Sequence, residues 1–249
     1  MTAPSERPVE ASSARAAYES WHSALPAVDA AVAPWIRMVR AALDPARDLD
    51  GRRVLEIGCG RGDFARWLGE RQSHLKQLVA ADFAVSAVAV ARKVAAEQRI
   101  EGIAWQVVDI GALDFPDATF DTVFSLETIE HTPSPRRAIE ELARVLAPGG
   151  RLFLTTPNYL NAAGLYRIYL RLRGRRFQEA GQPINQPMLL PHTQALVRRA
   201  GLKVLQIDAV GHPLPWPGGA FELDWMERLR PWSRWFGVQS IVIGEKPGR

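Results

Sequence analysis

Two hydrophobic periods alternate along residues 53–155 of the chain. Short, nearly continuous apolar runs are typical of strands that are buried on both faces of a parallel sheet. Between them lie segments with an apolar residue every three or four positions, which are typical of amphipathic helices. The pattern predicts strands at 53–57, 77–82, 104–109, 122–126 and 151–155. It predicts helices at about 63–71, 85–98 and 135–146.

This alternation of strand and helix predicts an α/β fold with a doubly wound, mostly parallel sheet and right-handed crossovers. The Pro-Gly-Gly run at 148–150 predicts a stop and a turn before the fifth strand. A short helix at 192–200 and strands at 203–210 and 239–245 complete the pattern. We therefore expect a sheet of seven strands.

The segments on either side of the core differ from it in composition. Residues 1–13 are small and polar, which predicts a disordered tail. The remaining chain, 14–249, is expected to be a single domain. Its parts are a helical lid (14–50), a cofactor-binding core (51–158), substrate-side helices with an insert rich in Trp and Pro (159–236), and a last strand (237–249).

The turn after the first predicted strand is rich in glycine. From Glu56 the sequence reads Glu-Ile-Gly-Cys-Gly-Arg-Gly-Asp. Glycine allows a sharp turn and a close approach of backbone to a ligand. In a parallel α/β sheet such a turn forms the floor of a cofactor site at the carboxyl end of the first strand. Asp63 stands where the dinucleotide fingerprint has its third glycine, which disfavours a nicotinamide-dependent enzyme.

Polar residues also follow the next three predicted strands. Asp82 ends the second strand, where a carboxylate can accept two hydrogen bonds from a ribose diol. Asp109 and Ile110 end the third strand, and a carboxylate beside apolar backbone suits an adenine amino group. Leu126 and Glu127 end the fourth strand. Because the carboxyl ends of parallel strands meet at one edge of a sheet, we expect these residues to line one crevice.

Four segments between residues 52 and 158 resemble motifs of class I S-adenosylmethionine (SAM) methyltransferases. They are VLEIGCGRGDFARWL, VAADFAVSAVAVARK, VVDIGALDFPDATFDTVFSLETIEH and LARVLAPGGRLFLTTPN. The resemblance implies a Rossmann-like methyltransferase fold with SAM as its cofactor. It implies that the glycines at 58 and 60 flank the methionine part of SAM, and that Asp82 contacts the ribose and Asp109 the adenine. The cofactor-binding residues expected on this basis are Glu56, Gly58, Cys59, Gly60, Asp82, Phe83, Asp109, Ile110 and Leu126.

A cluster of Glu127, Glu130 and His131 follows the fourth predicted strand. Two carboxylates and an imidazole can bind a divalent ion, and such an ion can acidify an acceptor hydroxyl. Alternatively, His131 acts directly as a general base, or the Glu–His pair anchors the loop. The segment resembles the ubiquinone-biosynthesis O-methyltransferases and the small-RNA 2′-O-methyltransferases. The resemblance implies that this cluster is involved in binding a divalent metal. We take His131 and Glu127 as the catalytic residues, with Glu130 as a third ligand if a metal is used.

The remaining histidines do not complete a metal site in the sequence. The small-RNA enzymes bring a second histidine nearby, whereas none lies between residues 132 and 191 here. His192 is near only if the fold brings it there. His22, His74 and His212 have no metal-ligand spacing and are interpreted as surface or packing residues. SAM is therefore the expected cofactor, and a divalent metal is left open.

Two apolar stripes with helical spacing follow the core. The first consists of Leu165, Ile168, Tyr169 and Leu172. We expect this stripe to pack, so that the arginines at 167, 171, 173, 175 and 176 face solvent. The second consists of Phe221, Trp225, Leu229 and Trp232 in the insert. It is interpreted as the wall of a hydrophobic substrate pocket, as a membrane-surface contact through Trp and Arg, or as a cover over the sheet.

Composition and charge narrow the classes of function. A hydrophobic content of 47% and a charged content of 23% are typical of a soluble globular protein. The single cysteine, Cys59, fits a reducing compartment and is interpreted as a packing residue. The first residues lack the apolar core of a signal peptide, so we expect a cytoplasmic location. The net charge of +4 combines −4 over residues 1–150 with +8 over residues 151–249.

These observations predict a SAM-dependent methyltransferase with a small-molecule substrate, hydrophobic or anionic, and a hydroxyl oxygen as acceptor. The basic C-terminal part keeps RNA 2′-O-methylation as an alternative, although no RNA-binding motif accompanies it. N- or C-methylation of a natural product and SAM binding without turnover are further alternatives. Nucleic acid and a membrane surface are disfavoured as partners, and the oligomeric state is open.

Overall fold

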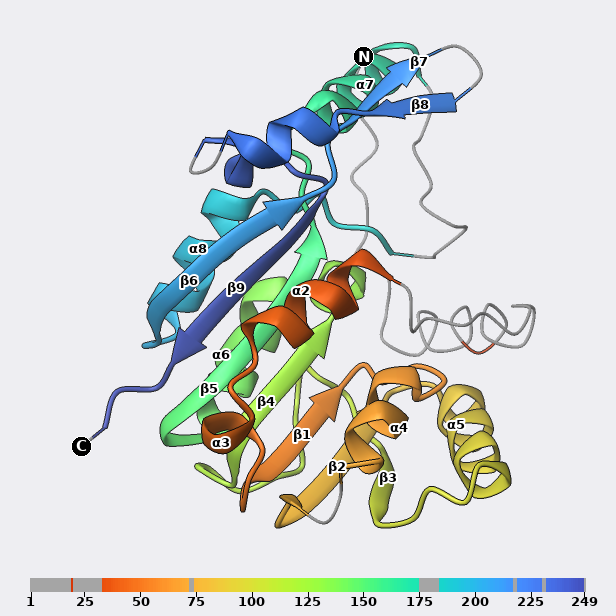
Figure 1. Ribbon diagram of the computed structural model, residues 1–249, viewed down its shortest axis with the longest axis vertical. Coiled ribbons are helices and arrows are strands. Elements are labelled where there is room, and N and C mark those ends of the chain that lie inside the picture. The colour runs from red at the N-terminus through yellow and green to blue at the C-terminus, as the bar shows by residue number, and fades with distance from the viewer. Residues whose placement is uncertain are drawn as a thin grey trace, which may run out of the picture.

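The computed structural model describes residues 19, 33–71, 74–174, 184–216, 219–229 and 232–248. These residues form a seven-stranded sheet in the order β3-β2-β1-β4-β5-β9-β6 and a separate β7–β8 hairpin (Figure 1). The strands are β1 (Arg53–Ile57), β2 (Gln77–Asp82), β3 (Ile103–Val107), β4 (Phe120–Leu126), β5 (Leu146–Pro157), β6 (Lys203–Val210), β7 (Pro213–Trp216), β8 (Gly219–Glu222) and β9 (Gln239–Glu245).

The order of the strands places a topological switch point at the centre of the sheet. Strands β1 to β5 run parallel, and β9 runs antiparallel to both β5 and β6. From β1 the chain moves outward to β3 and then crosses to β4 on the other side of β1. Open α/β sheets bind ligands at the carboxyl ends of the strands at such a point. The predicted doubly wound, mostly parallel sheet of seven strands is confirmed.

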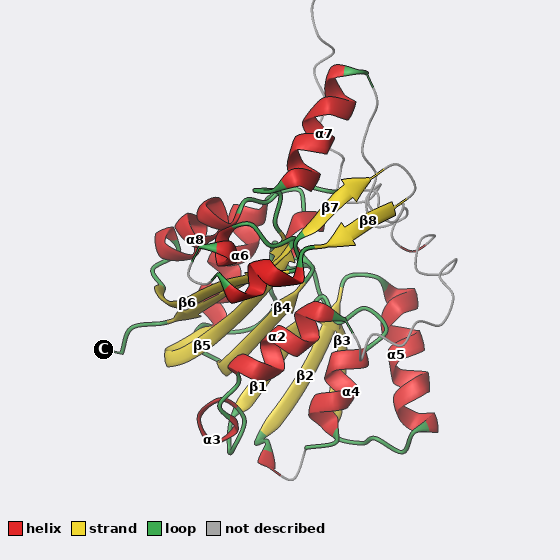
Figure 2. Cartoon of the chain, turned by 45° about the horizontal axis from the view of Figure 1, so that its top comes forward, coloured by secondary structure: helices red, strands yellow, loops and turns green. Residues whose placement is uncertain are grey.

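Helices cover both faces of the sheet (Figure 2). The helices α2 (Pro34–Ala42), α4 (Asp63–Gly69) and α5 (Val85–Glu97) lie on one face. The helices α6 (Pro135–Val145) and α8 (Leu190–Arg199) lie on the other face. Helix α7 (Ala162–Leu172) projects from the sheet at the end where the strands finish. Shorter helical turns are α3 (Pro45–Asp48), η3 (Ile129–His131), η4 (Asp224–Arg228) and η5 (Ser233–Trp235).

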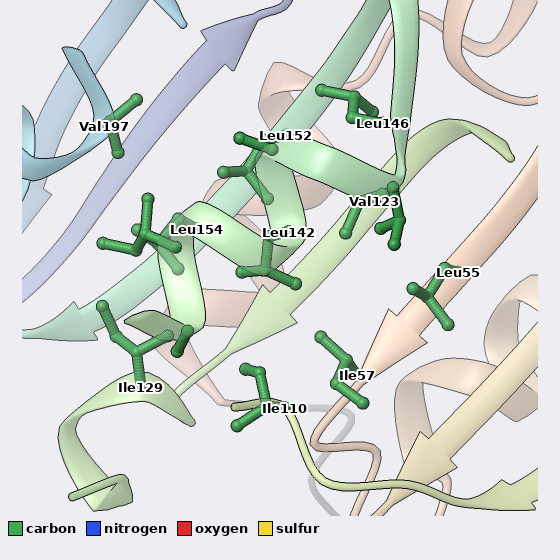
Figure 3. Packing of buried hydrophobic residues seen from close by; sticks show 14 of the residues in the cluster. Leu55, Ile57, Ile110, Val123, Ile129, Leu142, Leu146, Leu152, Leu154 and Val197 are labelled. Carbon is green, nitrogen blue, oxygen red and sulfur yellow. The ribbon is translucent and has the colours of Figure 1, made fainter. Parts of the chain in front are cut away.

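The core divides between the two faces because successive strand residues point to opposite sides. Leu55 of β1 packs on the α6 side together with Leu142 of that helix (Figure 3), in a cluster that also contains Ile139 of α6. Val54, the preceding residue, packs on the α2 side with Val39. All five side chains are fully buried. Burial of a Leu or Ile side chain stabilises the fold by about 1.5–3 kcal/mol.

A buried ion pair joins α3 to β5 at the end of the sheet away from the switch point. Nη1 of Arg151 donates to both carboxylate oxygens of Asp48 at 2.7 and 2.9 Å. Asp48 is 1% exposed and Arg151 is 8% exposed. Burial raises the pKa of the Asp48 carboxyl, although the backbone N–H of Asp44 and the guanidinium of Arg151 act in the opposite direction.

Several predicted boundaries are wrong. The third strand ends at Val107 and not at residue 109. The Pro-Gly-Gly run at 148–150 does not precede the fifth strand but lies within it. Leu146 already pairs with Phe120, and the register then shifts before Arg151 pairs with Thr122. The extra residues are absorbed as an irregularity in the strand because pairing exists on both sides of it.

Both apolar stripes behave differently from the prediction. The second stripe does not lie on one amphipathic helix, because Phe221 lies on β8 and Trp225 on the 3-10 turn η4. The first stripe does lie on one helix, α7, but it does not pack. Its members are exposed: Leu165 by 70%, Ile168 by 58%, Tyr169 by 50% and Leu172 by 82%.

Some predictions fall on residues that the structure does not describe. They are the tail 1–13, most of the lid over 14–32 with His22, and the arginines at 175 and 176. Within the described part of the predicted lid, α2 begins at Pro34 and packs on the sheet through Ile36 and Val39.

Candidate functional site

The turn after β1 has no room for a side chain at Gly58, which lies against Thr128 after β4, or at Gly62, which lies against Trp105 of β3. Gly58 has a φ of +79°, and a Cβ on it would lie 2.1 Å from Oγ1 of Thr128. Gly62 has a φ of +80°, and a Cβ there would lie 2.6 Å from the ring of Trp105. Glycine is needed at both positions, because other residues rarely adopt this conformation and because no Cβ fits.

Asp82 connects the end of β2 to this turn. Its Oδ2 accepts a hydrogen bond from the backbone N–H of Gly60 at 2.8 Å. Its Oδ1 accepts one from the N–H of Ala84 at 3.0 Å. The side chain is 7% exposed. Since an ionised carboxylate has about four acceptor sites, two remain for a ligand at this edge of the sheet.

Glu56 is a buried acid beneath the glycine turn. It is 3% exposed, and its Oε2 has no hydrogen-bond partner among the described residues. Burial raises the pKa of its carboxyl well above the usual value. The nearby carboxylates of Asp63 and Asp82 raise it further, whereas Arg66 lowers it. A buried oxygen without a partner is costly, so this position favours a ligand that supplies a donor or a positive charge.

The third predicted acid lies in a loop close to Asp82. The backbone N–H of Val108 donates to the carbonyl oxygen of Asp82 at 2.9 Å, which brings the loop after β3 to this edge. Asp109 is exposed, and its Oδ1 accepts from the N–H of Gly111 at 2.8 Å. Ile110 beside it is 8% exposed. The hydrogen bond from Val108 brings the loop that carries Asp109 and Ile110 to the end of β2, and a role of these residues in binding a cofactor stays a prediction.

The remaining predicted cofactor residues border the same edge. Phe83 is half-buried directly after Asp82, and Leu126 is buried at the end of β4. Cys59 is 6% exposed within the glycine turn. Burial raises the pKa of its thiol well above the usual value, and the carboxylates of Asp82 and Glu56 raise it further. A protonated, buried thiol is a packing group, in agreement with the interpretation from the sequence.

Glu127 stands in a strained position at the end of β4. Its φ is +49°, a left-handed conformation that costs a non-glycine residue about 1–2 kcal/mol. Its N–H lies 3.1 Å from both the carbonyl oxygen and Oγ1 of Thr155. The side-chain amide of Gln239 donates to both carboxylate oxygens, at 2.9 and 3.1 Å, in the orientation that satisfies hydrogen bonding. Strained residues of this kind concentrate at functional sites.

His131 and Glu130 face protein groups. Nδ1 of His131 lies 2.8 Å from the carbonyl oxygen of Ile184, so it carries a proton and donates. Its Nε2 lies 3.5 Å from Oε1 of Glu130, which is fully buried. The backbone carbonyl of Glu130 in turn accepts from the N–H of Gln186 at 2.7 Å. This geometry joins the loop after β4 to residues 184–186, which favours the anchoring interpretation of the Glu–His pair.

The described residues do not assemble a metal site. No group of three or more His, Cys, Asp or Glu side chains that could hold an ion occurs among them. His192 is exposed on α8. His74 is exposed beside Asp50, at 3.7 Å. His212 is buried, with its Nε2 3.0 Å from the carbonyl oxygen of Ser233.

Two contacts at this edge could not be read from the sequence. Gln239 reaches Glu127 because β9 pairs with β5, where Pro157 is opposite Gln239. Glu19, the one described residue of the predicted lid before position 33, accepts hydrogen bonds from the N–H groups of Val85 and Ser86 at 2.5 and 2.9 Å. No local pattern signals either contact, because both depend on tertiary structure.

Comparison with known proteins finds similarity to methyltransferases over the core of the chain. A model described as a methyltransferase domain matches residues 55–154 of the chain. A demethylmenaquinone methyltransferase of Thermus thermophilus is 37% identical over 139 residues, which are 55% of this chain and 62% of that protein. A ubiquinone biosynthesis O-methyltransferase of Alkalilimnicola ehrlichii is 35% identical over 121 residues, which are 48% and 47% of the two chains. The matched region thus spans about half the length of these relatives.

Solved structures confirm the fold. A putative methyltransferase of Haloferax volcanii, in complex with the Trm112 methyltransferase activator, superposes with a TM-score of 0.64 at 20% identity. The match covers 95% of this chain and 98% of that one. The [4+2]-cyclase SpnF superposes with a TM-score of 0.60 at 20% identity, over 86% and 82% of the two chains. The fold is therefore Rossmann-like, of the kind found in SAM-dependent methyltransferases.

Proposed function

We propose that this chain is a SAM-dependent methyltransferase that transfers a methyl group to a hydroxyl oxygen of a small molecule. The observation that carries the proposal is the buried Glu56, whose Oε2 lacks a partner among the described residues. It lies beneath a glycine turn that is tied to Asp82, at the switch point of a methyltransferase domain. SAM carries positive charge and a ribose diol, and both suit these two acids.

The residues of the chain fit SAM along one edge of the sheet. When bound, SAM supplies an electrophilic methyl group on a sulfonium. Glu56 and the glycine turn would hold its charged amino-acid end, because their acceptors and close backbone approach suit that end. Asp82 would bind the ribose, and Asp109 with its apolar neighbours the adenine. The full proposed set is Glu56, Gly58, Cys59, Gly60, Asp82, Phe83, Asp109, Ile110 and Leu126.

Glu127 is the proposed catalytic residue. Its backbone strain and its two hydrogen bonds from Gln239 fix the carboxylate at the end of β4. A fixed carboxylate there can take the proton of an acceptor hydroxyl, while the surrounding structure aligns the acceptor. His131 is proposed to act with it by anchoring the loop through Ile184. The relatives' names mention quinone and rifamycin substrates, which supports a small molecule as the acceptor here.

A thermal melt with SAM tests the cofactor site. At a SAM concentration about 100 times the Kd, binding stabilises the native state by about 2.7 kcal/mol, which is about 5–11 °C for a domain of this size. We expect Asp82→Asn to lose most of this shift, because the amide cannot accept from two N–H groups and a ribose. The matched control Asp114→Asn, at an exposed position, is expected to keep it. A wild-type protein without any SAM shift would overturn the proposal.

Release of S-adenosylhomocysteine, measured by mass spectrometry with a panel of hydroxylated aromatic acceptors, tests turnover. Glu127→Gln is expected to lower kcat by about 10²–10⁴-fold while the SAM shift persists. Glu97→Gln, an exposed position on α5, is the matched control. SAM binding without any product would favour a binding protein over an enzyme.

A further inference from the structure

Helix α7 is turned with its apolar side outward. A helix at the surface of a soluble protein normally faces its apolar stripe toward the core. Among the positions of α7 whose burial is described, the buried one is Gly164, where a Cβ would lie 1.8 Å from the carbonyl oxygen of Tyr159. Arg167 also points toward the body of the protein. Its Nη2 donates to the carbonyl oxygen of Asn185 at 3.0 Å, and its guanidinium lies 4.7 Å from the ring centroid of Tyr159.

The opposite side of α7 exposes large apolar side chains. Leu165, Ile168 and Leu172 are exposed by 70%, 58% and 82%. Tyr169 is exposed by 50%, and its ring stacks on that of Tyr166 with centroids 6.2 Å apart. We call these five residues the α7 stripe. Isolated apolar residues at a surface are normal, but a stripe along one whole helix face marks an interaction site.

Positive charge accompanies the α7 stripe. Helix α7 carries no acidic residue, and Arg171 and Arg173 are exposed at its end. Residues 158–176 contain five arginines and no acid. An amphipathic helix with aromatic and leucine side chains on one face and arginines beside them is suited to the interface of an anionic bilayer.

Neighbouring elements expose the same residue types. Helix α7 contacts β7, and the β7–β8 hairpin stands at the same end of the molecule (Figure 2). The chain after β7 exposes Phe221 by 60%, Trp225 by 56% and Trp232 by 77%. Tryptophan is enriched at membrane surfaces, where one part of the side chain contacts an apolar environment and another part contacts water.

We propose that the α7 stripe and its arginines dock this protein on an anionic phospholipid membrane as a peripheral protein. The charge of the partner follows from the arginines, and its apolar interior from the exposed Leu, Ile and Tyr side chains. No helix within the described ranges has the length and apolar character needed to cross a bilayer. Docking would turn the carboxyl edge of the sheet, where α7 begins, toward the membrane. The inference goes beyond methyl transfer and does not depend on it.

Vesicle flotation of the full chain tests the proposal. The probes are vesicles of phosphatidylcholine alone and of equal parts phosphatidylcholine and phosphatidylglycerol, at low and high salt. We expect binding to the mixed vesicles at low salt, much weaker binding to phosphatidylcholine, and release by salt. Absence of binding to the mixed vesicles at low salt would overturn the proposal.

Paired variants separate the α7 stripe from general surface charge. Arg171→Ser/Arg173→Ser is expected to lower vesicle partitioning about 30-fold, at about 1 kcal/mol for each arginine. Arg198→Ser/Arg199→Ser makes the same charge change on α8 and is expected to lower it far less. Equal losses in the two pairs would contradict the α7 assignment.

A pair of variants that leaves the charge of the protein unchanged tests the contribution of the apolar side chains to membrane binding. Leu172→Ser is expected to lower partitioning about tenfold or more. Leu205→Ser, an exposed position on β6, is expected to leave it nearly unchanged. Melting midpoints that match the wild type verify that the variants fold. If the wild type instead dimerises in sedimentation, loses the dimer in Leu172→Ser and ignores vesicles, the α7 stripe binds a second copy and the membrane proposal is wrong.

Discussion

Glu56 offers a direct link between the stability of this protein and its proposed cofactor site. The residue is 3% exposed, its Oε2 lacks a partner among the described residues, and two other carboxylates lie nearby. The perturbation is Glu56→Gln, which keeps the shape and removes the charge. We expect the ligand-free variant to be more stable than the ligand-free wild type at about pH 8. At this pH the folded wild type either buries the charge of Glu56 or holds a proton that the unfolded chain has lost, and both lower the free energy of unfolding.

The sign of the pH dependence follows from the raised pKa. In the unfolded chain the Glu56 carboxyl loses its proton at about pH 4.3, whereas in the folded chain it keeps the proton to higher pH. Between these two values the folded state binds one more proton than the unfolded state, so stability falls as the pH rises. The loss is about 1.4 kcal/mol per pH unit, or about 3–5 °C in the melting midpoint for a chain of this size. Glu56→Gln lacks this contribution.

The assay is a series of thermal melts from acid to alkaline pH, with and without SAM, on both proteins. As the pH rises above the pKa that the Glu56 carboxyl has in the unfolded chain, the melting midpoint of the wild type is expected to fall more steeply than that of Glu56→Gln. The SAM shift is expected to be smaller in the variant, because the charged amino-acid end of SAM no longer meets the acidic side chain of residue 56. Glu70→Gln, 61% exposed at the end of α4, is the matched control. Parallel pH profiles, or a variant that is less stable at about pH 8, would refute the reasoning.

Two further predictions concern packing. Gly58→Ala is expected to destabilise the chain by more than about 1–2 kcal/mol and to abolish the SAM shift, since its Cβ would lie 2.1 Å from Oγ1 of Thr128 at a φ of +79°; a melt with an unchanged SAM shift would contradict this. Arg151→Met is expected to lower stability by about 3–5 kcal/mol, or about 6–20 °C, because it leaves the buried Asp48 without its partner. A midpoint within a few degrees of the wild type would show that the pair contributes little.

The α7 stripe shows where local patterns mislead. Its spacing is that of an amphipathic helix, and the helix exists. Its orientation is set by Gly164 and Arg167, which fit against Tyr159 and Asn185 and turn the apolar residues outward. A periodic pattern establishes that a helix has two faces, but which face is buried depends on what the rest of the chain offers.

The sequence by itself determined the parallel α/β architecture, the strand ends at Ile57, Asp82 and Leu126, and the candidate cofactor acids. These follow from short-range regularities, because buried parallel strands need apolar runs and a tight turn after a strand needs glycine. Only the tertiary structure decided how the site is completed. Gln239 meets Glu127 across 112 positions of sequence through the pairing of β9 with β5. Such contacts leave no periodic pattern in the sequence, because a single distant side chain makes the contact and the residues next to it in the sequence are not constrained by it.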